Sequence, residues 1–199
     1  MLFRPVLAAF LAVAFLASCA QENLAEKPEP LGDFALGLNI IVADNVQKVP
    51  ISRDATVEEW ETAMVKAVNE RFSRYDGAKL YNIGINVDGY ALAPPGIPVV
   101  AAPKSILVIT ANVWDDAAGK KLNEKGKQLT VFEQFSGESA ILGSGLTRTK
   151  EQQMESLSRN AARAVEEWMR LNPTWFGLPD TRPSAADAPT VASEAAPAN

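Results

Sequence analysis

Between Met154 and Leu171 the apolar residues recur at the spacing of an α-helix. Thr149 with Gln152 three residues later forms a capping box ahead of this stretch, and Pro173 ends it because proline disfavours helix at the preceding residue, Asn172. The stretch therefore predicts a long amphipathic helix that must bury one face against another layer. The apolar face comprises Met154, Leu157, Ala161, Ala164 or Val165, Trp168 and Leu171.

A second helix is predicted after Thr56, which forms a capping box with Glu59. Its apolar positions are Trp60, Met64, Ala67 or Val68, and Phe72, and Gly77 is a natural stop. Because Trp60 and Trp168 lie on the two helical stripes, both are predicted to be core residues.

Four segments between and around the helices have the alternating pattern of half-buried strands. In the first, Phe34, Leu36, Leu38, Ile40 and Val42 recur at period two and should share one buried face. The strands are predicted over 34–42, 80–92, 105–114 and 128–135, with a charged hairpin loop over 115–127 and short edge pieces at 46–51 and 137–145.

These elements predict an α+β fold. About four mostly antiparallel strands and two amphipathic helices bury their apolar sides most simply as a two-layer sandwich, with both helices on one face of the sheet. Trp175 and Phe176 are expected to fold back onto the core. The predicted domain covers 33–178, and the Pro- and Ala-rich residues 179–199 form a disordered tail.

The N-terminus has the anatomy of a secretory signal. Arg4 precedes an apolar run over 6–17, which is shorter than the roughly 20 residues that a membrane-spanning helix needs. Residues 1–18 are therefore predicted to be a cleaved leader.

The tetrad Leu16-Ala17-Ser18-Cys19 resembles the lipobox of bacterial lipoproteins. This resemblance implies that the Cys19 thiol carries a diacylglycerol and anchors the mature chain to a membrane, with 19–32 as a flexible tether. Ala20 stands where inner-membrane lipoproteins typically carry Asp, which implies the periplasmic face of the outer membrane. An ordinary cleaved signal with Cys19 left over is the alternative.

Composition narrows the chemistry. The chain has no histidine and one cysteine, so the usual general base, the usual zinc ligand and an internal disulfide are all missing. The net charge of −5 argues against a nucleic-acid partner. We predict no catalytic residues, no metal site and no cofactor.

Two connections are candidate sites. The uncharged loop 91–103 contains four prolines and carries Leu92, Ile97, Val99 and Val100, which either contact a partner or lipid or pack on the sheet edge. Gly143-Ser144-Gly145 precedes the last helix and is a weak candidate for anion binding through backbone N–H groups, a glycine turn being the ordinary interpretation.

Three functions are compatible with these features. The first is a non-enzymatic docking or assembly protein of the envelope, similar in anchor and coarse layout to the lipopolysaccharide-assembly lipoprotein and to the auxiliary lipoproteins of lipid-transporting ABC systems. The second is a carrier with an apolar pocket between helices and sheet. The third is a hydrolase that uses Asp115, Asp116 or Glu133. The oligomeric state stays open.

Overall fold

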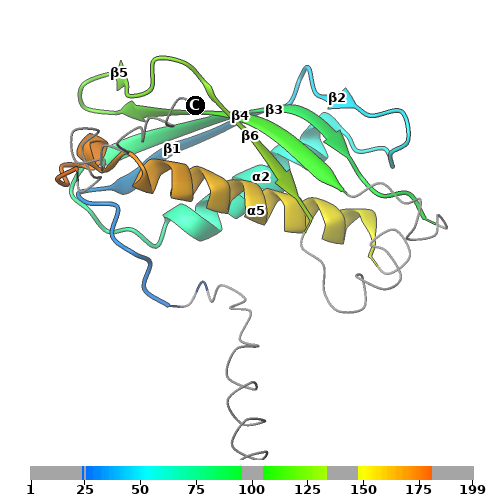
Figure 1. The fold of residues 1–199 in the computed structure, drawn as a ribbon, viewed down its shortest axis with the longest axis horizontal. Helices are drawn as coiled ribbons and strands as arrows, with labels where there is room; N and C mark the ends of the chain where they lie inside the picture. Colours follow the sequence, from blue (N-terminus) through cyan, green and yellow to red (C-terminus); the bar gives the residue numbers. More distant parts are fainter. Residues whose placement is uncertain (1–23, 25, 96–104, 134–147, 181–199) are drawn as a thin grey trace, which may run out of the picture.

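The computed structural model of the protein describes residues 24, 26–95, 105–133 and 148–180. Within these ranges one sheet and two helices form a two-layer sandwich, which confirms the predicted α+β fold (Figure 1). The elements are β1 (Ala35–Val42), β2 (Gln47–Lys48), α2 (Val57–Phe72), β3 (Leu80–Ala91), β4 (Ile106–Asp115), β5 (Lys120–Lys121), β6 (Lys127–Phe132), α5 (Lys150–Arg170) and the short 3-10 helix η1 (Pro173–Phe176).

The sheet is mixed. β1 runs parallel to β3, whereas β3 pairs with β4 and β4 pairs with β6 in antiparallel fashion. The short strand β2 continues alongside β3, and β5 pairs with the far end of β4. Among the described strands, β1 therefore lies at one edge of the sheet and β6 at the other.

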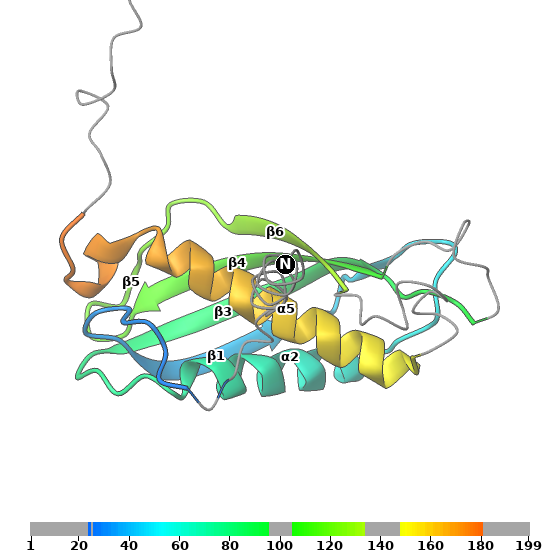
Figure 2. The same cartoon turned by 60° about the horizontal axis from the view of Figure 1, so that its bottom comes forward.

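Both helices cover the same face of the sheet and run side by side in the same direction (Figure 2). Ion pairs between the helices show the shared direction, because the residue numbers increase together along both: Lys66 pairs with Glu155 at 3.0 Å and Arg71 with Glu166 at 2.5 Å. The two predicted capping boxes, at Thr56 and Thr149, are present. α2 ends at Phe72, earlier than Gly77, because Ser73 closes its last turn.

The core lies between the helices and the sheet. Tyr81, Ile83, Ile85 and Val87 of β3 face the helices and are buried, as are alternate residues of β4. Trp60 is fully buried, and Trp168 is partly buried against Trp175, so both predicted core assignments are confirmed. The apolar helix residues of this core are Trp60, Met64, Ala67, Val68, Phe72, Met154, Leu157, Ala161, Ala162, Val165 and Met169.

An aromatic cluster closes one end of the core. The ring of Phe34 lies 5.5 Å from those of Tyr81 and Phe176 and 5.9 Å from that of Phe72, measured between ring centroids. Phe176 is 1% exposed, which confirms that the segment after α5 folds back onto the core.

β1 departs from the sequence prediction. Leu36 packs against the core, but Leu38, Ile40 and Val42 point to the uncovered face of the sheet. The cause is an irregularity in the pairing of β1 with β3 between Leu36 and Asn39, which reverses the alternation of side chains. The expectation that all five apolar residues share a buried face is therefore wrong for the last three.

The N-terminal segment is also more ordered than predicted. Leu31 is 1% exposed, Glu29 pairs with Arg170 at 3.2 Å, and Arg74 donates to the backbone oxygens of Glu26 and Leu24 at 3.3 and 3.5 Å. The predicted tether over 19–32 is wrong for its second half, because this half packs on the domain. The leader 1–18, the edge piece 137–145 and nearly all of the tail 179–199 lie outside the described residues.

Replacing Leu31 with alanine tests whether this segment belongs to the folded domain. We expect Leu31→Ala to lower the free energy of unfolding by about 2–4 kcal/mol, since it removes a buried side chain and leaves a cavity. Leu171→Ala is the matched control because Leu171 is 62% exposed, and it should change stability by less than about 0.5 kcal/mol. Urea unfolding measures both, and equal values would contradict the assignment.

Candidate functional site

The face of the sheet opposite the helices carries a row of apolar side chains on β1. Leu38, Ile40 and Val42 are 58%, 51% and 38% exposed, and they alternate with Asn39 and Ile41, which face α2 and the core. We call these three residues the β1 row. Because these side chains are already about half buried, covering the rest of each would contribute about 0.5–1.5 kcal/mol, and the row is a candidate contact surface.

Trp114 of β4 adds an aromatic ring to the same face. A Cβ atom at Gly84 would lie 2.7 Å from a carbon of this ring, so the absence of a side chain at Gly84 makes room for the indole. Gly84 is the register partner of Ile40 on one side and of Asn112 on the other. The ring and the β1 row therefore occupy neighbouring positions on the uncovered face.

The polar side chains between these apolar groups are fixed by hydrogen bonds with one another. Asn82 donates to Asp116 at 2.8 Å, Asn86 donates to Asp88 at 2.5 Å, and Thr110 donates to the same Asp88 at 2.7 Å. Satisfied side chains of this kind keep the face flat and ordered. Because these polar side chains already have partners, a protein that binds this face would gain free energy mainly by covering its apolar residues.

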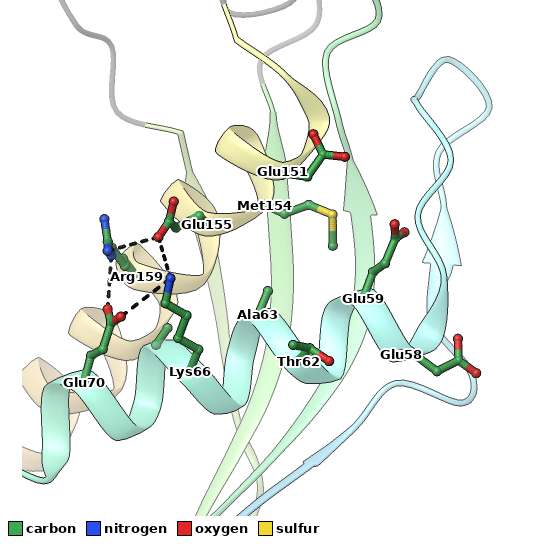
Figure 3. A pocket seen from close by; sticks show the side chains of 11 residues that line it. Glu58, Glu59, Thr62, Ala63, Lys66, Glu70, Glu151, Met154, Glu155 and Arg159 are labelled. Atoms are coloured by element: carbon green, nitrogen blue, oxygen red, sulfur yellow. Dashed lines mark hydrogen bonds and ion pairs between the residues drawn. The ribbon is translucent and has the colours of Figure 1, made fainter.

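The outer surface of the helix layer holds a groove of about 420 Å³ between α2 and α5 (Figure 3). Ala63, Ala67 and Met154 form its apolar part. One end is closed by four charges, in which Lys66 and Arg159 each contact both Glu70 and Glu155 at 3.0–3.8 Å. The groove is a surface feature and does not match the pocket between helices and sheet that a carrier would need.

Glu58 and Glu151 lie at the other end of the groove, in the first turns of α2 and α5. Hydrogen bonds from their own backbone N–H groups, and then from Thr56 and Thr149, hold the pKa values of Glu58 and Glu151 below their usual range. These carboxylates therefore stay ionised at neutral pH and cannot act as general acids there.

A buried carboxylate joins the two helices near their C-terminal ends. Glu166 is fully buried, accepts hydrogen bonds from Arg71 at 2.5 Å, Arg74 at 3.4 Å and the hydroxyl of Tyr75, and forms an ion pair with Arg170 at 3.1 Å. Burial, and then this bond to Glu166, raises the pKa of Tyr75. The cluster is structural, because Arg74 and Arg170 also hold the N-terminal segment.

Removal of this carboxylate should destabilise the protein strongly. We expect Glu166→Gln to cost about 3–5 kcal/mol, since it leaves a buried arginine without its counter-charge. The adjacent Glu167→Gln is the control, because Glu167 is exposed and pairs with Arg163 at 3.7 Å, an arrangement worth less than about 0.5 kcal/mol. Thermal unfolding at pH 7 compares the two, and a similar loss in both would rule out the buried role.

Glu133 does not meet the two aspartates that were proposed with it for a hydrolase. Asp115 caps the turn at Ala118 and Asp116 accepts from Asn82, both at one end of β4. Glu133 is buried at the other end of β4, beside Ser105, and pairs with Arg148 at 3.0 Å. The nine residues of β4 that separate these ends span roughly 30 Å, so no pair joins Glu133 to either aspartate.

The other predicted site residues fall into two groups. Leu92 is fully buried, so its assignment as a contact residue is wrong, and it belongs to the core. Ile97, Val99, Val100, Gly143, Ser144, Gly145 and Cys19 lie outside the described residues. Within the described ranges, no group of three or more acidic or cysteine side chains is placed to hold a metal ion, and no helix has the length and apolar character to cross a membrane.

Comparison with known proteins assigns the chain to no family. No family model and no curated protein matches it. Similar solved structures include a protein of Caulobacter crescentus CB15 provisionally described as a lipoprotein, with 10% identity, a TM-score of 0.38, and coverage of 66% of this chain and 90% of that one. A Xanthomonas campestris protein of family DUF330 has 8% identity, a TM-score of 0.39, and coverage of 74% and 92%. A minor lipoprotein of Acinetobacter baumannii has 12% identity, a TM-score of 0.29, and coverage of 67% and 91%.

Proposed function

We propose that this chain is a bacterial lipoprotein, anchored through Cys19 at the periplasmic face of the outer membrane, where it works as a non-enzymatic docking or assembly protein. The observation that carries the docking role is the exposed β1 row, which lies beside the Trp114 ring on the face of the sheet that the helices leave uncovered. Exposed apolar surface of this kind marks a contact site in a soluble domain.

The packing of the N-terminal segment supports an anchored domain held close to the bilayer. The first described residue, Leu24, contacts the domain through its backbone oxygen, which accepts a hydrogen bond from Arg74. Four residues separate Leu24 from Cys19, and even a fully extended chain over these five Cα-to-Cα steps reaches only about 17 Å. The lipid would therefore keep the domain within that distance of the membrane surface.

The side on which this segment leaves the domain also matters. Its partners, Arg74 after α2 and Arg170 at the end of α5, belong to the helix layer, and Figure 1 shows the segment passing below this layer with the sheet above it. An anchor on this side leaves the uncovered face of the sheet turned away from the bilayer. The β1 row and Trp114 are then accessible to proteins in the periplasm.

The arrangement of acidic residues favours docking over hydrolysis. Glu133 lies at the opposite end of β4 from both aspartates and pairs with Arg148, while Asp115 and Asp116 lie in a surface turn where Asp116 is exposed. A hydrolase of this type needs two carboxyl groups within about 10 Å of each other.

Cys19→Ala tests the anchor. We expect the wild-type protein to sediment with membranes and the variant to appear in the soluble fraction, because acyl chains provide the attachment. Density-gradient fractionation of the wild-type membranes then separates inner from outer membrane. A variant that stays in the membrane fraction would contradict lipid attachment at this residue.

A photoreactive amino acid at position 114 tests the docking role. We expect it to crosslink, in intact cells, to an envelope protein whose mass differs from that of this chain, because this position lies on the uncovered face. The same amino acid at position 167 is the control, since Glu167 is exposed on the helix layer. Equal capture from both positions, or none from position 114, would contradict docking through this face.

A further inference from the structure

We propose that the free edge of β1 pairs with β1 of a second copy of this chain, in antiparallel orientation and with a two-fold axis at Ile40. The two sheets then become one continuous sheet with both helix layers on the same side. This inference extends the proposed function, and the lipid anchor enters it only as a reason to prefer this orientation.

The first reason is that β1 lacks the protection normally found on an exposed edge strand. Its eight residues, Ala-Leu-Gly-Leu-Asn-Ile-Ile-Val, contain neither a charge nor a proline, and three of the aliphatic side chains are exposed. The opposite edge strand, β6, begins with Lys127, and Asn160 of α5 donates to the backbone oxygen of Phe132 at 2.7 Å. Among the described strands, β1 therefore has the edge that is suited to pairing with a further strand.

The second reason is the direction of the backbone groups. The N–H of Leu38 donates to Asn82 of β3 at 2.7 Å, whereas the N–H of Ala43 reaches Glu61 of α2. Because these directions alternate along a strand, the backbone groups of Asn39 and Ile41 face the free edge. A two-fold axis at Ile40 pairs Asn39 of one copy with Ile41 of the other and Leu38 with Val42, which joins the two β1 rows on one face.

The third reason is that the flank of α2 is compatible with its own copy. Asn39 donates to Val65 and Asn69, while Glu61 lies near Ala43, so α2 runs antiparallel to β1. The same axis places Val65 near Val65 of the second copy and Glu61 near Asn69, whose amide can donate to a carboxylate. No pair of like charges meets across this axis among these residues.

The fourth reason is the position of the anchors. A two-fold axis perpendicular to the sheet keeps both helix layers, and both N-terminal segments, on the same side, so both lipids can enter one bilayer. Stacking the uncovered faces against each other would place the two anchors on opposite sides. Confinement in one membrane also raises the effective concentration of the second copy.

Disulfide crosslinking in intact cells tests the pairing, with the full-length acylated protein carrying single cysteines. Cys19 is the only native cysteine, and acylation blocks its thiol. We expect Ile40→Cys to shift the band to twice the monomer mass under oxidation, because residue 40 opposes itself at a non-hydrogen-bonded position. Leu38→Cys and Val42→Cys should each crosslink poorly alone and well when co-expressed. Thr130→Cys, on the same face of β6, is the control and should stay monomeric.

Ile40→Lys provides a second measurement that needs no crosslink. It places two like charges at the axis and should convert a dimer to a monomer, as measured by light scattering of the detergent-solubilised protein with the far-UV circular dichroism unchanged. Failure of Ile40→Cys to form the dimer, equal crosslinking of Thr130→Cys, or crosslinking of Ile40→Cys to a different protein would each overturn the proposal. Fractionation of the same cells reports on the anchor separately: membrane-bound protein without the dimer refutes only the pairing, and soluble protein with the dimer refutes only the anchor.

Discussion

The irregular pairing of β1 with β3 determines which apolar residues of the first strand face the core and which remain exposed. Asn82 of β3 accepts a hydrogen bond from the N–H of Leu38 at 2.7 Å, and its side-chain oxygen lies only 2.5 Å from where a Cβ of residue 37 would be. Gly37 is therefore required for this approach. Before it, Phe34 and Leu36 turn inward to the aromatic cluster and the core, and after it the β1 row turns outward.

The charges of the helix layer serve a different purpose. Glu166 neutralises arginines from both helices in a buried setting, and two of these, Arg74 and Arg170, continue to the N-terminal segment. Breaking a buried pair of this kind is expensive, so the helices and this segment are coupled into one unit. The charged quartet of Lys66, Glu70, Glu155 and Arg159 is more exposed and contributes less to this coupling.

The sequence was sufficient to predict the layers but not the details of β1. Both helices could be predicted because capping boxes and apolar stripes are local signals, and they appear at Thr56 and Thr149 as expected. The period-two pattern of the first strand was misleading, since it assumes regular pairing. Gly37, an isolated glycine inside a strand pattern, was the available signal for an irregularity.

Long-range contacts explain the other differences. Leu31 follows two prolines and resembles part of a linker, and only its contact with the core at the far end of the chain makes it structural. Leu92 adjoins an apolar loop in the sequence, yet the pairing of β3 places it in the core. Glu133 and Asp115 are both near strand ends, and only the direction of β4 shows that these ends are opposite.

A domain with an apolar edge strand of this kind has few ways to protect that edge. A charged or proline-containing strand would do so within the monomer, but β1 has neither. A covering helix would do so as well, but α2 lies on the inner face and touches the edge only through side chains such as Asn39 and Glu61. The remaining solution is a strand from another chain, and the N-terminal segment limits how that chain can be oriented. In the pairing that we propose, both helix layers and both N-terminal segments lie on one side of the continuous sheet, and the joined β1 rows and both Trp114 rings lie on the other side.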